Sequence, residues 1–221
     1  MNIFFVPCYF ISFLNNEVIL LYNLNINGYP LFCVFWNLFL VFIAFLITRA
    51  LILFCEKNNL AKTGNKIFVF LLGILWLVFI PNTAYLVVII RHLLNFCPDN
   101  YYRVCVNNAW MVPFFFIYAL IGWIFFVILT RRIKNLISGL FGGACSKIFI
   151  ICVIPLISLG VLLGLINRWN SWELFINPII IAEDVYQYLS QASRIINWAA
   201  FTLFFYLLYY IGNIVLKDKK K

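Results

Sequence analysis

Five stretches of this chain are long, apolar and almost free of charged side chains, and they limit its fold more than any other feature. A helix needs around 20 apolar residues to cross a hydrocarbon core roughly 30 Å thick. Backbone groups find no water there, so such stretches form helices or closed barrels. Barrel strands alternate polar and apolar residues, and Phe114-Phe115-Phe116 does not. The sequence predicts membrane-spanning helices at about 31–55, 67–90, 104–129, 148–166 and 195–216.

The composition supports a single integral membrane domain, 1–221. Hydrophobic residues make up 66% of the chain and charged residues 10%, with a mean hydropathy of +1.03. Soluble domains average roughly 45–50% apolar and 25% charged residues, so this chain has too few charges to cover a surface that faces water. Sparse Gly, Pro and Cys exclude a disordered tail, a collagen and a disulfide scaffold. We expect an all-α, polytopic transmembrane bundle whose main partner is the lipid bilayer.

The N-terminal stretch 3–24 is long enough to cross the membrane, but Asn15-Asn16-Glu17 lies at its centre. A central acid costs about 2.5–3.5 kcal/mol on insertion scales. It is not an ordinary signal peptide, because no Lys or Arg precedes Arg49. A sixth, imperfect membrane segment or an interfacial helix fits this pattern, and we favour the sixth segment.

Basic residues between the spans predict the orientation. Eleven Lys and Arg residues lie in the first loop, the third loop and the C-terminal tail, whereas four lie in the second and fourth loops. Cytoplasmic loops carry the excess of Lys and Arg, so the third loop, a flexible stretch around Gly142-Gly143, should be cytoplasmic. The net charge of +9 then reflects topology, and no basic face remains for nucleic acid. We expect a plasma-membrane protein with a cytoplasmic C-terminus.

The second span contains a proline within its outer half. Pro81 has no N–H, so the carbonyl of Leu77 loses its helical partner. In lipid that carbonyl needs another donor, and Asn82 and Thr83 follow directly in the sequence. Two interpretations stay open: a proline kink held by Asn82, which we favour, or a broken helix lining a polar cavity.

The end of the fourth span carries a second group of signals. Gly160 and Gly164 are four apart, a spacing that lets helices approach closely. Asn170 and Glu173 fit an N-cap followed by an N3 acid, and Pro178 suits a first helical turn. We expect an amphipathic outer helix over 170–194. Its apolar face would carry Ile181, Val185, Tyr188 and Leu189, and its polar face would carry Glu183, Asp184 and Gln187.

Both groups fall on the predicted outer face, together with several polar side chains, namely Asn37, His92, Asp99, Asn107, Asn108 and Asn197. They predict a polar pocket that opens outward, although a genome rich in AT would also overuse Asn. The candidate ligand-binding residues are Asn82, Tyr85, His92, Arg168, Trp169, Asn170, Ser171, Trp172 and Glu173, with Pro81 as a helix kink and Gly160 and Gly164 as helix-packing positions.

Catalytic and metal signals are weak. His92 is the one histidine, and no C-x-x-C or similar spacing suggests a metal site. Cys97 and Cys105 are both predicted outside, which leaves a disulfide open. No Gly-rich phosphate loop occurs. Nucleophilic catalysis needs a base within reach of Ser or Cys; His92 near Ser171 is conceivable across helices, but nothing in the sequence demands it. We expect no metal and no cofactor, and an enzyme is the less favoured interpretation.

Three stretches, Phe35–Leu40, Leu75–Tyr85 and Arg168–Glu173, together resemble a bacterial membrane family catalogued as a domain of unknown function, number thirteen-sixty-one in words. The resemblance extends from about Phe32 to Pro178, and Arg168-Trp169-Asn170-Ser171-Trp172 is its most specific part. Members typically carry a hydrophobic N-terminal segment, which favours six segments here. The resemblance brings no known reaction.

The chain departs from that family at three places. Ile89 stands where the family has Asp, Tyr101-Tyr102-Arg103 where it has Trp-Tyr-Asp, and Leu165 where Arg follows the glycine. Relative to the family, this chain therefore lacks the acidic side chain at the first two of these places and the basic side chain at the third. If those acids and that Arg form the family's working site, this copy has lost part of it, and we infer that an ion-paired network was lost as a unit.

Three functions remain open. In the first, Arg168, partnered by Glu173, binds a small anionic ligand or lipid head group, with Asn82, Tyr85 and His92 on the other wall. The second is a non-catalytic partner that assembles or stabilises a membrane complex, or a homo-oligomer, through Gly160, Gly164 and the aromatic rim. The third is a lipid-modifying enzyme that uses His92 or Glu173 as acid or base.

Overall fold

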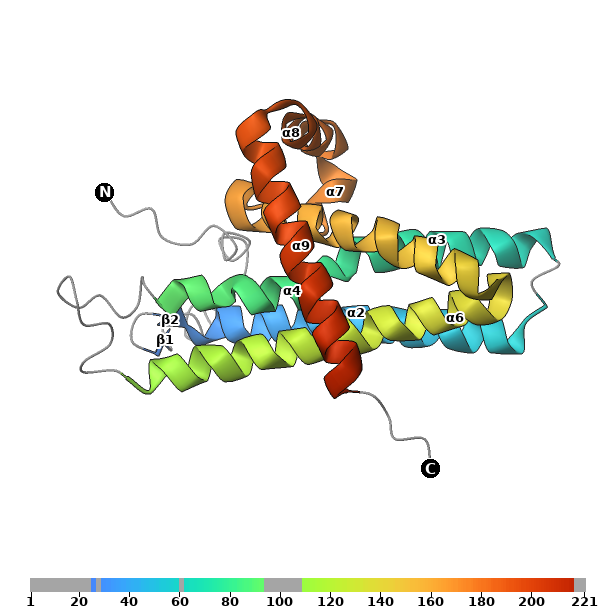
Figure 1. The fold of residues 1–221 in the computed structure, drawn as a ribbon, viewed down its shortest axis with the longest axis horizontal. Helices are drawn as coiled ribbons and strands as arrows, with labels where there is room; N and C mark the ends of the chain where they lie inside the picture. Colours follow the sequence, from blue (N-terminus) through green and yellow to red (C-terminus); the bar gives the residue numbers. More distant parts are fainter. Residues whose placement is uncertain (1–24, 27–28, 60–61, 94–108, 217–221) are drawn as a thin grey trace, which may run out of the picture.

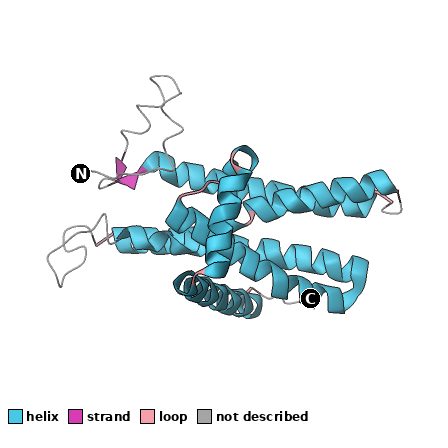
Figure 2. Ribbon diagram, turned by 90° about the horizontal axis from the view of Figure 1, so that it is seen from above, coloured by secondary structure: helices cyan, strands magenta, loops and turns pink. Residues whose placement is uncertain are grey.

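The computed structural model describes residues 25–26, 29–59, 62–93 and 109–216, and the predicted all-α fold is confirmed. A short antiparallel bridge pairs β1 (Asn25–Ile26) with β2 (Tyr29–Pro30) beside the first long helix. Figure 2 shows this bridge at one end of a structure otherwise built from helices. The N-terminal stretch 3–24 and the pair Cys97 and Cys105 lie outside the described residues.

Four helices of the described residues are long and apolar enough to cross a membrane. They are α2 (Leu31–Lys57); the run of α3 (Thr63–Phe79), α4 (Pro81–Val88) and η2 (Ile89–His92); the run of α6 (Met111–Leu162) and η3 (Leu163–Asn167); and α9 (Ala192–Val215). Two shorter helices, α7 (Glu173–Ile176) and α8 (Pro178–Ser190), project at the top of Figure 1.

The predicted spans 104–129 and 148–166 are joined in one helical run, α6, where we expected two helices and a flexible loop. Residues 104–108 lie outside the described part. The backbone leaves the helical region inside α6 at Gly142, with φ 88° and ψ 167°, a conformation that glycine adopts readily. The chain doubles back there (Figure 1), giving α6 a first limb, 111–141, and a second limb, 143–162. Helix boundaries therefore give four candidate spans rather than five.

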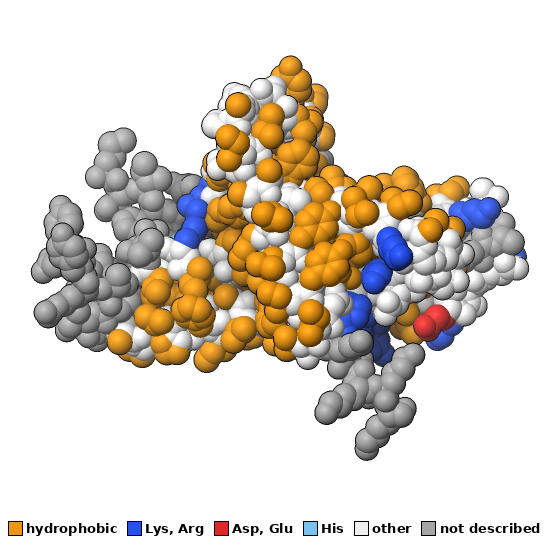
Figure 3. All heavy atoms as spheres, viewed as in Figure 1, with side chains coloured by type: hydrophobic (Ala, Val, Ile, Leu, Met, Phe, Trp, Pro, Cys, Tyr) orange, Lys and Arg blue, Asp and Glu red, His pale blue; other side chains and the backbone are white. Residues whose placement is uncertain are grey.

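The long helices pack around a core made of both limbs of α6 together with α2, α3 and α9. Ala44, Trp76, Phe126, Ile154 and Phe205 are among its most buried members. Lipid is as apolar as the side chains, so close packing and hydrogen bonds hold such helices together. Trp76 Nε1 accordingly donates to Thr48 Oγ1 at 3.0 Å inside this core. Outside it, hydrophobic side chains cover the middle of the face in Figure 3, with Lys and Arg to either side.

The predicted fifth span forms α9, but α9 crosses both limbs of α6 steeply instead of running beside them (Figure 1). Trp198 Nε1 donates to the carbonyl of Pro155 at 2.9 Å on the second limb. On the first limb, Trp123 Nε1 donates to the carbonyl of Leu208 at 2.9 Å. These bonds hold the two limbs together through α9.

A proline explains part of this contact. Pro155 lies inside α6 and has no N–H, so the carbonyl of Ile151 loses its helical donor. The Tyr206 hydroxyl donates to that carbonyl at 2.7 Å. Three residues further along, Ser158 Oγ lies 2.6 Å from Thr202 Oγ1. The crossing helix therefore supplies a hydrogen bond that the broken helix cannot make itself.

The contact between α4 and α6 depends on a glycine. A Cβ at Gly122 would overlap Leu86 Cβ and lie 2.7 Å from the carbonyl oxygen of Thr83. We expect Gly122→Ala to cost about 1–3 kcal/mol by overpacking, which would lower the Tm by roughly 2–10 °C. Thermal unfolding of the purified protein in detergent measures this change.

Gly73→Ala is the matched control, because a Cβ there meets nothing within 4 Å. Equal melting temperatures for the two variants would contradict the proposed close contact of α4 and α6.

Candidate functional site

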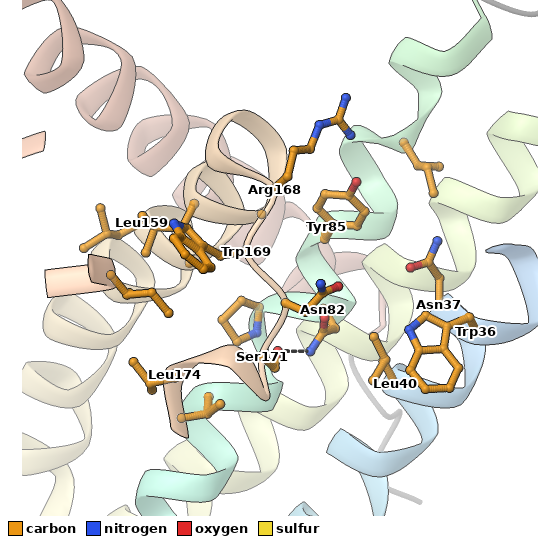
Figure 4. Close-up of a pocket in the computed structure, with 18 of the residues that line it drawn as sticks. Trp36, Asn37, Leu40, Asn82, Tyr85, Leu159, Arg168, Trp169, Ser171 and Leu174 are labelled. Atoms are coloured by element: carbon orange, nitrogen blue, oxygen red, sulfur yellow. Dashed lines mark hydrogen bonds between the residues drawn. The ribbon is translucent and has the colours of Figure 1, made fainter. Parts of the chain in front are cut away.

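A cavity of about 250 Å³ lies between α2, α4, the second limb of α6 and the segment that follows η3 (Figure 4). Of the predicted ligand-binding residues, those that line it are Asn82, Tyr85, His92, Arg168, Trp169, Asn170 and Ser171. Pro81, Gly160 and Gly164 line it as well. Trp172 and Glu173 are not among its lining residues. The structure therefore brings the proline segment and the Arg-Trp-Asn-Ser segment into one pocket.

Pro81 forms one wall of the pocket by interrupting the second span. α3 ends at Phe79 and Pro81 begins α4. Asn82 Nδ2 donates to the carbonyl of Phe79 at 2.9 Å, and Thr83 Oγ1 donates to the carbonyl of Ile80 at 2.7 Å. Asn82 thus satisfies a backbone group at the break, as expected, but at Phe79 rather than Leu77.

The two predicted packing glycines lie against this wall. A Cβ at Gly160 would be 2.7 and 2.9 Å from ring carbons of Pro81. A Cβ at Gly164 would be 3.5 Å from the carbonyl oxygen of Trp169 and 3.7 Å from the Tyr85 ring. The glycine at position 160 lets the second limb of α6 approach the proline ring directly.

Arg168 has the left-handed backbone conformation, with φ 65° and ψ 25°. It is the one non-glycine residue of the described ranges with a positive φ, and such residues cost roughly 1–2 kcal/mol. It follows a π-helical turn, η3, and the N–H of Trp169 donates back to the carbonyl of Leu163 at 3.2 Å. The N–H of Arg168 bonds the same carbonyl, so the oxygen of Leu163 accepts two bonds at the end of the π-helical turn. The sharp turn brings the segment after Arg168 back over the pocket.

Residues 168–171, which we call the pocket segment, are held from two sides. Toward α4, Asn82 Nδ2 donates to Ser171 Oγ at 2.8 Å, the dashed line in Figure 4. Toward α8, Trp169 Nε1 donates to Asp184 Oδ2 at 2.6 Å, a charge-assisted bond of the stronger kind. The pocket segment therefore connects the kinked second span to the outer helix.

The outer helix differs from the prediction in three details. It is divided into α7 and α8, with Pro178 in the first turn of α8 as expected. Leu189, expected to face inward, is 54% exposed, and Asp184, expected on the free polar face, binds Trp169. Ile181 and Tyr188 are buried as predicted.

Tyr188 adds a second contact between α8 and the end of α6. Its hydroxyl donates to Asn167 Oδ1 at 3.2 Å. Burial raises the pKa of the Tyr188 phenol, so the hydroxyl keeps its proton and remains a donor.

Glu173 is not the partner of Arg168. Its Oε2 accepts the backbone N–H of Asn170 at 2.5 Å and the Asn170 side-chain amide at 3.0 Å. This is one half of a capping box, whereas the predicted cap by the Asn170 side chain does not form and α7 begins after Trp172. Trp172 packs edge to face on Trp36, with ring centroids 5.5 Å apart. Trp172 and Glu173 therefore contact residues that line the pocket, Trp36 and Asn170, without lining it themselves.

Positive charge gathers at one end of the pocket. Arg168 lines this end, and Arg91, which is not among the lining residues, lies within electrostatic range of it. In the part of the chain that the structure describes, neither arginine forms an ion pair with a carboxylate. Arg91 Nη2 is buried without a hydrogen-bond partner among those residues. The pocket therefore has a cationic end whose charges are not neutralised by described carboxylates.

Sequence reasoning missed some lining residues. Trp36 lines the pocket, and its Nε1 is buried with no partner among the described residues. Asn37, noted only as an outer polar residue, lies beside it on α2 (Figure 4). Arg91, considered in the sequence only for its charge, does not line the pocket but lies in the chain between Ile89 and His92, which both do. No group of three His, Cys, Asp or Glu residues suited to a metal occurs within the described ranges.

A family model described as "Protein of unknown function (DUF1361)" matches residues 36–211. The chain belongs to this family. The matched range contains α2 from Trp36, the proline segment, the pocket segment and most of α9. No curated protein and no solved structure matches the chain.

The two hydrogen bonds of Asn82, one to the carbonyl of Phe79 and one to Ser171, can be tested separately. Asn82→Leu removes the bonds to Phe79 and Ser171, so we expect a loss of about 1–3 kcal/mol from a backbone carbonyl left unsatisfied in apolar surroundings and a lower folded yield. Ser171→Ala removes only the bond between the walls, and we expect a loss of about 1 kcal/mol. Monodisperse yield and Tm in detergent, without ligand, measure both.

If Asn82→Leu behaves like wild type while Ser171→Ala does not, then Asn82 does not satisfy the backbone at the break.

Proposed function

We propose that this protein is a multi-pass membrane protein that binds a small anionic ligand or a lipid head group in the pocket beside Arg168, without transforming it. The observation that carries the proposal is the cationic end described above. Arg168 is kept in an unfavourable backbone conformation, and such residues persist where the surrounding structure determines them and often where they serve a site. An anion is the ligand that this arrangement favours.

Charge and donors at this end suit an anion. Arg91 and Arg168 repel each other, and a bound anion would replace that repulsion by attraction. A guanidinium gives short, charge-assisted hydrogen bonds to phosphate or carboxylate oxygens. Position 89, where the resembled family carries an acid, holds a buried Ile that lines the pocket. Without an acid there, the pocket keeps its positive potential.

The other two functions receive less support. A partner surface at Gly160 is disfavoured, because this glycine is occupied by Pro81 of the same chain. Acid–base chemistry by Glu173 is disfavoured, because its carboxylate is taken by Asn170. His92 lines the pocket and is the residue on which an enzymatic alternative would depend. We favour binding over catalysis.

For the topology we propose that α6 crosses the membrane twice, once with each limb, and that its turn at Gly142 lies in the cytoplasm. The excess of Lys and Arg beside that turn supports this orientation. The pocket would then face outward, the C-terminus would be cytoplasmic, and the plasma membrane would be the location. The amphipathic α8 would lie at the outer interface.

Topology reporters can test this orientation. A reporter inserted at Gly143, in the exposed turn, should be active only on the cytoplasmic side, and one inserted at Gln191, between α8 and α9, only on the outer side. Reporters at both positions that respond on the same side would refute the outward pocket.

Anion binding can be tested with Arg168→Gln. We expect inorganic phosphate or glycerol phosphate to raise the Tm of the wild-type protein in a neutral detergent by roughly 5–10 °C at 100 times Kd. Hydrogen bonds to charged groups contribute about 1.5–3 kcal/mol, so the variant should bind roughly 10–100-fold more weakly. Raising the salt concentration should weaken binding further.

Arg132→Gln is the control, because Arg132 is an exposed arginine on the first limb of α6 outside the pocket. Equal binding by both variants, or no Tm rise in the wild type, would argue against an anion site at Arg168.

A further inference from the structure

We infer, resting on the proposed function, that the bound anion is the head group of a membrane amphiphile whose hydrocarbon chain leaves the pocket sideways into the bilayer, past Leu156 and Leu174. The ligand class is a phosphate or carboxylate that carries an alkyl or acyl chain. A free, water-soluble anion would use only the polar part of the pocket.

The pocket is divided into a polar and an apolar part. Figure 4 shows Arg168 and Tyr85 toward one end of the lining and Leu159 and Leu174 toward the other. The apolar part is formed by side chains from four elements, namely Leu77, Leu156, Leu159, Leu174 and Ile181. A site for a free anion has no need of such a wall, whereas an amphiphile presents one charged and one apolar end.

The apolar part reaches the outer surface of the protein. Leu156 on the second limb of α6 is 45% exposed and Leu174 on α7 is 37% exposed, although both line the pocket. The surface beyond Leu174 continues through Phe175 and Ile176, which are 61% and 66% exposed. Exposed apolar surface of this kind on a membrane protein faces lipid. The pocket therefore opens where a hydrocarbon chain already lies.

The size of the cavity agrees with partial enclosure. About 250 Å³ exceeds the roughly 150 Å³ cavity that holds a benzene molecule, but lies below the roughly 300–1,000 Å³ of pockets that enclose a whole drug-sized ligand. A head group and the first few methylene groups fit. The rest of a long chain must remain outside, in the bilayer.

The position of the pocket segment also fits a ligand that enters from the membrane. Ser171 lies between Arg168 and Leu174 of α7 in Figure 4. The Asn82–Ser171 and Trp169–Asp184 bonds fix this segment from both sides. A lateral opening beside a fixed segment admits a chain without requiring the segment to move.

The test compares anions that differ only in their chain. The protein is placed in nanodiscs of neutral lipid, and binding of inorganic phosphate, butyl phosphate, hexyl phosphate and octyl phosphate is measured, with empty nanodiscs correcting for partition. We expect affinity to rise by roughly fourfold for each methylene group buried in the pocket, so that hexyl phosphate binds at least tenfold more tightly than inorganic phosphate.

Two variants separate the chain from the head group. Leu156→Gln with Leu174→Gln should reduce the advantage of hexyl phosphate over inorganic phosphate at least tenfold, while inorganic phosphate binds as in the wild type. Leu174→Trp should narrow the opening and give the same loss for octyl phosphate, which provides a second test if the double variant does not fold. Ile176→Gln is the matched control, because Ile176 is an exposed apolar residue of α7 that does not line the pocket.

Each outcome decides between the two proposals. Equal affinity for all four anions, with binding still dependent on Arg168, would show that the hydrocarbon chain does not bind in the pocket. The anion site at Arg168 would still be supported. Alkyl phosphate binding that is unchanged in Arg168→Gln means that the chain binds elsewhere on the apolar surface and overturns this inference. No binding of any of the four anions overturns the anion site itself.

Discussion

Backbone carbonyls freed by proline inside apolar helices must find new donors, and the arrangement of this molecule depends on how they do so. Lipid supplies no hydrogen bonds, so the donors come from the protein. At Pro155 the donor is the Tyr206 hydroxyl, which comes from another helix and attaches α9 to α6. At the Pro81 break the freed carbonyl is that of Leu77, whereas the Asn82 amide bonds the neighbouring carbonyl of Phe79 and reaches Ser171 as well. In both places, the residue that satisfies the backbone also joins two elements.

The pocket follows from the second of these breaks. With Asn82 turned toward Ser171, the pocket segment lies over the kink, and Arg168 is brought to the cationic end by a sharp left-handed turn. Gly160 allows the second limb of α6 to contact Pro81, which brings Leu156 and Leu159 of that limb to the apolar part. A local irregularity in the helix is thus both the reason for the cavity and the source of its polar wall.

Much of this was readable in the sequence, and the failures have physical reasons. Apolar runs located the helices, and Pro81, Asn82 and the Arg168–Ser171 stretch located the pocket, because proline, buried amides and an interfacial arginine have few uses in lipid. Charge patterns predicted a loop around Gly142, but a turn at one residue lets helix continue on both sides. The pairing of Glu173 with Arg168 failed, because a backbone N–H three residues away is a nearer donor for that carboxylate. The steep path of α9 could not be predicted, since the bonds that set it join residues far apart in the chain.

The path of α9 has a consequence for assembly. α9 leaves the ribosome after both limbs of α6, yet the hydrogen bonds from Trp123 and Tyr206 that join those limbs to it require it to be present. The carbonyl of Ile151 therefore has no partner from α9 until α9 has been translated. A chain stopped before that point would keep an unsatisfied carbonyl inside an apolar helix, a defect that the packing of α9 removes.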